Sequence, residues 1–113
     1  MDKVIDKIAA LGVPGLVLLV AISLTGLAGG AAIVAALAML GGPFGMLGGI
    51  AVLGILTLIS KAIAYYGVAA IFKGVVSRLN AQGISKGEIR SRVNSYPISK
   101  SLKRTLFEHL DHL

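Results

Sequence analysis

Two histidines near the C-terminal end of the chain have a spacing that could bind a metal ion. His109 and His112 stand three positions apart in a helical pattern, with Asp111 between them. This spacing can bring two imidazoles to one ion. Two ligands are too few for a typical zinc site, and the sequence offers no third ligand within reach. We therefore expect surface histidines, no bound metal and no other cofactor.

Catalytic motifs are missing from the rest of the sequence. No set of nucleophile, base and orienting residue can be assembled from its serines, threonines and histidines. The glycine-rich stretches lack the Gly-x-x-x-x-Gly-Lys-Ser/Thr form of a phosphate-binding loop, and they lie in apolar sequence. Cysteine is absent, which excludes disulfides and thiolate metal sites. We therefore expect that the protein is not an enzyme.

The dominant feature is an apolar run from Ile8 to Ser60 that contains no charged residue, Asn, Gln or His. Only 14% of the chain is charged, whereas soluble domains average about 25%. In water such a run would have to be covered by a large core, and the rest of the chain is too short to provide one. In a bilayer, a helix satisfies its own backbone hydrogen bonds. The run is too long for one crossing of ~20 residues and fits two. We therefore predict an all-α protein built on a transmembrane helical hairpin.

The first predicted transmembrane segment, Pro14 to Leu40, exceeds the thickness of the hydrocarbon layer. At 1.5 Å per residue it would extend ~40 Å, against ~30 Å for the layer, so it must tilt or break, and we expect any break near Gly29. Small residues recur at a spacing of four, which lets helix backbones approach closely in lipid. Because a hairpin needs only one such face on each helix, we expect the excess to serve self-association as well. These residues are Gly26, Ala28, Gly30, Ala32, Ala36, Gly41, Gly45 and Gly49.

The turn of the hairpin is predicted at Gly41, Gly42 and Pro43, because two glycines followed by a proline stop a helix. No charged residue accompanies this turn. Full crossings and a re-entrant tip are therefore both compatible with the sequence.

The second predicted transmembrane segment runs from Phe44 to Phe72 and contains Lys61. Because the apolar run ends at Lys61, we expect its side chain to reach the headgroup region, beside the aromatic residues Tyr65 and Tyr66. A polar path lined by Lys61 is the alternative interpretation. The few polar residues that could line a pore or a helix interface are Ser23, Thr25, Thr57 and Lys61.

Residues 1–12 form the first predicted unit, a short amphipathic helix. Val4, Ile5, Ile8 and Leu11 share one side of a helix, a pattern suited to the plane of the headgroups. The first turn of the following helix is the alternative. Gly12 ends the pattern, and Pro14 suits the start of a new helix. Although Gly15–Leu27 resembles the core of a signal peptide, the residues before it carry no net positive side-chain charge, so we expect no cleavage.

Residues 13–82 form the hairpin unit, and residues 83–113 form a helical tail. Gly83 is expected to end the preceding helix. Ser85 and Glu88 fit a capping box, Pro97 ends the short helix that follows, and Ser99 can cap a last helix. The apolar stripe of that last helix consists of Ile98, Leu102, Leu106, Leu110 and Leu113. We expect a small helix-turn-helix that packs on itself, on a neighbouring subunit or on anionic lipid.

The net charge of +6 is concentrated towards the C-terminal end. Positive residues near transmembrane helices face the cytoplasm, which places the C-terminus there, and two crossings place the N-terminus with it. Basic residues beside a membrane suit lipid headgroups. A cytoplasmic protein could also bind residues 84–113, whereas we expect no nucleic-acid binding because a third helix is missing. The expected headgroup contacts are Lys73, Arg78, Lys86, Arg90 and Arg92.

These features predict an integral membrane protein that self-assembles into a homo-oligomer and opens a pore or permeabilises the bilayer. The architecture resembles that of holins and mechanosensitive channel subunits, but no motif is shared, so no residue role follows from the resemblance. A structural protein that shapes or coats membrane with a wedge-like hairpin is the first alternative. An accessory subunit of a larger membrane complex is the second.

Overall fold

The computed structural model describes residues 2–25, 48–96, 98 and 100–113. Within these ranges the chain forms six helices and no strand, so the predicted all-α class is confirmed for this part. The predicted hairpin turn and the expected break near Gly29 lie outside the described residues. The helices are α1 (Asp2–Ala10), α2 (Val13–Thr25), α5 (Gly48–Tyr66), α6 (Val68–Ala81), α7 (Lys86–Ser95) and α8 (Lys100–Asp111).

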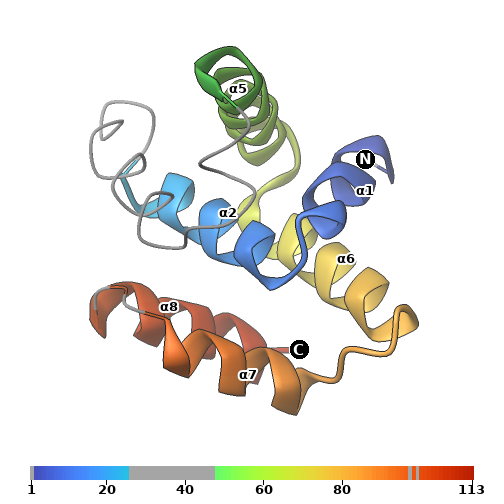
Figure 1. Ribbon diagram of the computed structural model, residues 1–113, viewed down its shortest axis with the longest axis vertical. Helices are drawn as coiled ribbons and strands as arrows, with labels where there is room; N and C mark the ends of the chain where they lie inside the picture. Colours follow the sequence, from blue (N-terminus) through green and yellow to red (C-terminus); the bar gives the residue numbers. More distant parts are fainter. Residues whose placement is uncertain (1, 26–47, 97, 99) are drawn as a thin grey trace.

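Helix α2 lies at the centre of the described structure (Figure 1). It contacts α1, α5, α6, α7 and α8, and every residue from Leu16 to Ile22 is buried. A helix that is apolar on all sides requires such a complete cover. The rest of the chain therefore does surround this part of the apolar run, contrary to the premise from which two membrane crossings were predicted.

Two glycines mark sharp bends between consecutive helices. Gly12 has φ +74° at the bend between α1 and α2, and Gly67 has φ +84° at the bend between α5 and α6. Glycine adopts this region readily, because it has no Cβ. The second predicted segment, Phe44 to Phe72, therefore turns at Gly67, a bend that the sequence did not locate.

No described helix is by itself long and apolar enough to cross a membrane. Two bent pairs satisfy the length and composition of a span only when their members are taken together. The first pair, Asp2–Ala10 with Val13–Leu24, bends by 117°, and the second, Thr57–Tyr66 with Val68–Ala81, bends by 113°. The hairpin of two spanning helices therefore stays a prediction.

The predicted N-terminal amphipathic helix is confirmed as α1, but its apolar face covers protein. Ile5 and Ile8 are buried. Ile5 packs on Gly74 of α6, where an added Cβ would lie 2.3 Å from the Cδ1 atom of Ile5. An ion pair between Asp6 and Arg78 lies beside this contact. Helix α1 is therefore held against α6 by both an apolar contact and a charged one.

The end of α6 and the start of α7 follow the sequence prediction. Gly83 has φ +92°, the amide of Ile84 donates to the carbonyl of Leu79 at 3.0 Å, and the amide of Gly83 donates to the carbonyl of Asn80 at 3.0 Å. This pair of bonds is the Schellman motif, in which glycine ends a helix. The hydroxyl of Ser85 then accepts a hydrogen bond from the amide of Glu88 at 3.1 Å, which caps α7.

Helices α7 and α8 form the predicted helical pair of the tail, and both pack on α2. Leu102, Leu106 and Leu110 are buried as the stripe predicts, whereas Leu113 is 39% exposed because α8 ends at Asp111. Pro97 and Ser99, the expected stop and cap, lie outside the described residues. Of the three packing arrangements expected for the tail, the structure shows the tail packed on itself. It also shows the tail packed on α2, which was not expected.

Candidate membrane-interaction site

The predicted helix-packing residues fall mostly in the part of the chain that the structure leaves undescribed. Gly49 lies near the start of α5. The others, including the turn residues, lie outside the described residues: Gly26, Ala28, Gly30, Ala32, Ala36, Gly41, Gly42, Pro43 and Gly45. Their role in self-association therefore stays a prediction.

The predicted polar residues divide between two helices. The hydroxyl of Ser23, on α2, donates to the carbonyl of Val20 at 2.7 Å, which satisfies it within its own helix. Thr25 is the last residue of α2. Thr57 and Lys61 are exposed and lie one helical turn apart on α5. The structure therefore places Thr57 and Lys61 on one outer face of α5, apart from Ser23.

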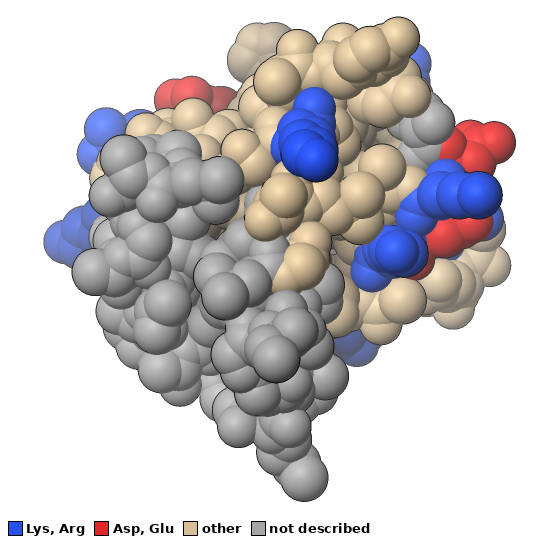
Figure 2. Space-filling model, turned by 90° about the horizontal axis from the view of Figure 1, so that it is seen from above, with Lys and Arg blue, Asp and Glu red and all other residues tan. Residues whose placement is uncertain are grey.

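The outer face of α5 is largely apolar. Tyr65 lies one turn beyond Lys61 and is 82% exposed. Its ring meets the ring of Tyr66 edge-on, with 4.8 Å between the ring centres. Figure 2 views the molecule from the side on which α5 projects: uncharged side chains cover much of the described surface, a basic side chain stands among them, and charged side chains gather towards the edges. Exposed tyrosines beside a lysine on an apolar surface are typical of the membrane interface.

Three of the five cations expected to bind lipid headgroups are paired with carboxylates. Arg78 pairs with Asp6, Arg90 with Asp111, and Arg92 with Glu88 at 2.9 Å. The other two, Lys73 and Lys86, are exposed. Each of the three pairs is about half exposed, so it contributes at most about 1 kcal/mol to stability. Because each of these arginines already interacts with a carboxylate, it attracts a phosphate less strongly.

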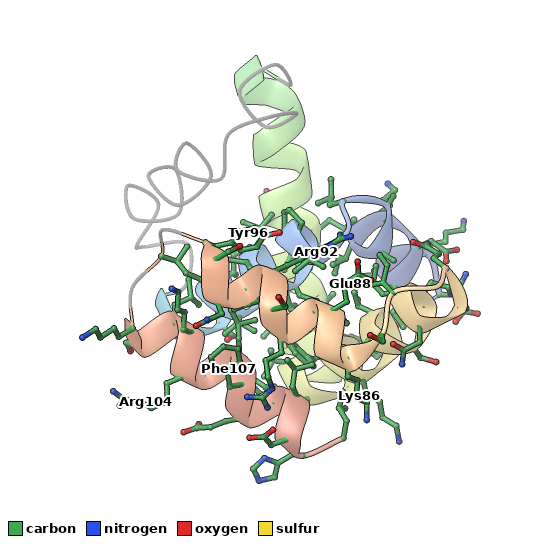
Figure 3. The ribbon with its side chains drawn as sticks, turned by 60° about the horizontal axis from the view of Figure 1, so that its bottom comes forward. Lys86, Glu88, Arg92, Tyr96, Arg104 and Phe107 are labelled. Carbon is green, nitrogen blue, oxygen red and sulfur yellow. The ribbon has the colours of Figure 1, made fainter. Side chains whose placement is uncertain are left out.

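Contacts around Phe107 hold α7 and α8 together and were not predicted from the sequence (Figure 3). The guanidinium of Arg90 lies 4.7 Å from the centre of the Phe107 ring, a cation–π contact. The ammonium of Lys103 donates to the backbone carbonyl of Asn94 at 2.9 Å.

Partial burial raises the pKa of the Tyr96 hydroxyl at the end of α7, and the positive charge of Arg92 opposes that rise.

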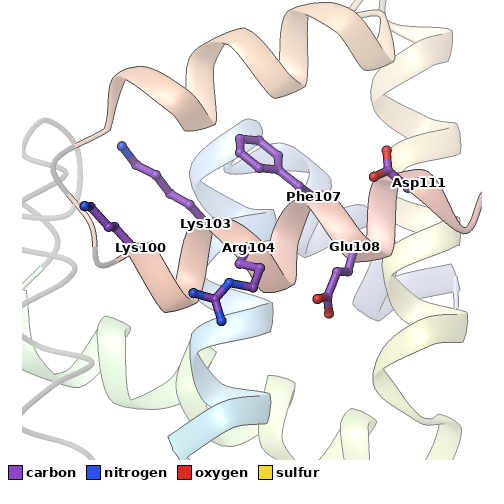
Figure 4. A pocket seen from close by; sticks show the side chains of 6 residues that line it. All are labelled: Lys100, Lys103, Arg104, Phe107, Glu108 and Asp111. Carbon is purple, nitrogen blue, oxygen red and sulfur yellow. The ribbon is translucent and has the colours of Figure 1, made fainter.

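Phe107 lines two open hollows on the surface of the tail. One hollow, of ≈ 350 Å³, includes Arg90 and Asn94 in its wall. The other, of ≈ 390 Å³, is lined along α8 and is shown in Figure 4. Its six lining residues are Lys100, Lys103, Arg104, Phe107, Glu108 and Asp111. The signal for this second hollow is present in the sequence, because Lys103 and Arg104 follow Lys100 by three and four positions on a helical pattern.

The two histidines have different surroundings. The ring of His109 stacks on Phe72 of α6, with 5.1 Å between ring centres. The Nδ1 atom of His112 lies 2.7 Å from the carbonyl oxygen of Glu108. In the part of the chain that is described, no group of three or more ligating side chains could hold a metal ion. His109 therefore serves to pack α8 on α6.

Comparisons of the chain with models of known protein families, with curated proteins and with solved structures give no match. Function must therefore be inferred from the residues themselves. The described part offers three features for this purpose: a central helix without polar faces, two glycine bends, and a basic tail with a hollow beside Phe107.

Proposed function

We propose that this protein inserts into lipid bilayers and, as a homo-oligomer, makes them permeable. The observation that carries the proposal is α2, which has no charged residue and is buried from Leu16 to Ile22. The sequence after α2 stays uncharged as far as Ser60. A helix without a polar face needs either protein or lipid around it. Lipid can replace the protein cover of α2 without exposing any of its apolar surface to water.

Amphipathic helices provide much of the cover of α2. Helix α8 turns Leu102, Leu106 and Leu110 inward and carries its charged residues on other sides. Such helices can turn the same apolar face towards a membrane surface. The pair α7 and α8 is joined to α6 through residues 82–85, so it can leave α2 as one unit. Separation of this unit would expose α2 to lipid.

The bend at Gly67 supports a second part of the rearrangement. Thr57–Tyr66 and Val68–Ala81 together have the length and composition of a span. They would form one continuous helix if Gly67 changed from φ +84° to a helical φ. Hinges of conformational change are a few residues at the ends of elements that absorb such changes. We assign this hinge to Gly67.

Self-association is supported by the small residues at a spacing of four in the sequence after α2. This feature leads to a direct test on the full chain, reconstituted into vesicles that contain a self-quenching dye. Leakage should rise more steeply than in proportion to the ratio of protein to lipid, because several copies must meet. The double variant Ala32→Leu/Ala36→Leu should leak much less, since larger side chains keep helices apart.

The matched control is Ala64→Leu/Ala70→Leu, which adds the same atoms at exposed positions of α5 and α6. This control should leak like the unchanged protein. A protein that enters the vesicles as a monomer and releases no dye would refute the proposal. Tubulated vesicles that keep their dye would instead support the membrane-shaping alternative, and electron microscopy of the same samples would detect them.

A further inference from the structure

The charges of α8 run against the dipole of the helix. Its basic residues Lys100, Lys103 and Arg104 lie in its first half, and its acidic residues Glu108 and Asp111 lie in its second half. A helix favours acidic residues at its start and basic residues at its end. Lys103 and Arg104 also stand three and four positions after Lys100, where like charges repel. The free protein therefore loses stability by keeping them there.

Helix α7 shows the favourable arrangement in the same tail. Glu88 lies in its first turn and Arg92 in its last turn, and the two form an ion pair at 2.9 Å. The reversed pattern of α8 is thus a local property and does not extend to the tail as a whole. An anion bound at the start of α8 would remove the repulsion that the free helix carries.

The cations of α8 have no carboxylate partner among the described residues. None of the ion pairs in the described ranges includes Lys100, Lys103 or Arg104. Lys100 and Arg104 are exposed, and Lys103 reaches only the carbonyl of Asn94. Together they line one end of the ≈ 390 Å³ hollow, with the ring of Phe107 beside them (Figure 4). The hollow therefore combines three cations that form no ion pair with an aromatic surface, and its two carboxylates, Glu108 and Asp111, belong to the later half of α8.

The position of this cluster favours lipid over other anionic partners. Helix α8 begins on the side of the molecule where α2 ends (Figures 1 and 3). From Thr25 the chain continues into residues 26–47, which contain no polar side chain. The cluster thus lies on the side from which the most apolar sequence departs. Nucleic acid or an acidic protein would offer nothing for that sequence to enter.

We propose that Lys100, Lys103 and Arg104, with Phe107, form a site for anionic phospholipid headgroups on the membrane surface. This inference rests on the proposed function, and it assigns the first lipid contact to α8. The sequence had assigned headgroup contacts to other cations, three of which are paired in the structure. Binding at α8 would neutralise the three cations and hold the end of α2 close to the bilayer.

The test is flotation of the full chain with vesicles of phosphatidylcholine, with and without phosphatidylglycerol. The test variant is Lys100→Gln/Arg104→Gln, which keeps Lys103 and its contact with Asn94. Each basic residue at an anionic surface strengthens binding about fivefold, so the double variant should bind the anionic vesicles roughly 30-fold more weakly. Binding to pure phosphatidylcholine should not change.

The matched control is Lys3→Gln/Lys7→Gln, which removes the same charge from exposed positions of α1. This control should bind anionic vesicles within about threefold of the unchanged protein, because screening confines the effect of a charge to ~10 Å. Thermal unfolding of the α8 variant should occur at the same temperature or higher, since repulsion is removed. A purely structural role for the two residues would lower it.

Equal losses in the two double variants would refute the α8 site, because net charge alone would then explain the binding. A short single-stranded oligonucleotide and a water-soluble lipid with a glycerophosphate headgroup can each be tested for displacing the protein from anionic vesicles. If the oligonucleotide displaces the protein at the lower concentration, the choice of lipid is also refuted. Anionic binding that depends on α8 without dye release would leave the α8 site standing and refute permeabilisation. Dye release by the unchanged protein, with binding that the α8 variant does not weaken, would support permeabilisation and refute the α8 site.

Discussion

Replacement of Gly67 by alanine should move the protein from the compact structure towards a continuous helix from α5 into α6. Gly67 has φ +84° and ψ 148°, a conformation that an L residue with a side chain rarely adopts. A Cβ built at this position meets no atom within 4 Å, so the effect of the substitution is conformational and not a clash. The change therefore tests the hinge without disturbing the packing around it.

The magnitude follows from two contributions with the same direction. Alanine in the bent conformation costs about 1–3 kcal/mol. Alanine within a helix is favoured over glycine by about 1 kcal/mol. The equilibrium between bent and continuous forms should therefore shift by about 2–4 kcal/mol, which is roughly 30- to 700-fold. Vesicle leakage should become faster, and the compact form should unfold at a lower temperature.

Two other glycines provide matched controls. Gly83 also has positive φ, +92°, and a Cβ there meets no atom within 4 Å. Gly83→Ala should therefore weaken the compact form without joining α5 to α6. Gly54 lies within α5, where a Cβ likewise meets nothing, so Gly54→Ala should only strengthen that helix. If Gly67→Ala leaks no faster than Gly83→Ala at a similar loss of thermal stability, Gly67 is not the hinge.

Three further predictions concern the compact structure. Gly15→Ala should lower the free energy of unfolding by about 1–3 kcal/mol, because its Cβ would lie 2.3 Å from the backbone oxygen of Ile8; thermal unfolding measures this, and no loss would contradict the close crossing of α1 and α2. Leu106→Ala should cost about 2–5 kcal/mol in chemical denaturation, since Leu106 is 0% exposed, whereas Leu113→Ala should change stability little. The pKa of Tyr96 is raised above its ordinary value of 10.0 in the folded state, so its contribution to stability is fully present below pH 10.0 and is lost as pH rises through the folded pKa. The free energy of unfolding should therefore fall with pH above 10.0, and Tyr96→Phe should remove this part of the fall. Denaturation measured at a series of pH values tests this.

Local features of the fold could be read from the sequence, because neighbouring residues determine them. The end of α6 at Gly83 and the cap of α7 at Ser85 depend only on backbone geometry and one hydroxyl. The buried face of α8 follows from the spacing of its leucines. The amphipathic pattern of α1 likewise identified its apolar side.

Contacts between distant parts of the chain could not be read in this way. Nothing near Ile5 in the sequence indicates that it packs on Gly74, or that Asp6 pairs with Arg78. The bend at Gly67 was missed because a single glycine inside an apolar helical pattern is usually tolerated. The cations of α8 were visible, but only the structure shows that they lack the carboxylate partners that neutralise Arg90 and Arg92.

The chemistry of the core explains how one sequence can suit both a protein cover and lipid. Among the described residues no polar or charged side chain is buried, and the hydroxyl of Ser23 bonds within its own helix. Transfer of α2 into lipid therefore breaks no buried polar contact, whereas a buried ion pair would have made opening costly. The contacts that oppose opening are the apolar ones of the leucines of α8 and of His109 on the buried ring of Phe72, together with the half-exposed pair of Asp6 with Arg78. Control of insertion must then come from glycine conformation and surface charge, which are the two features that Gly67→Ala and the α8 variant change.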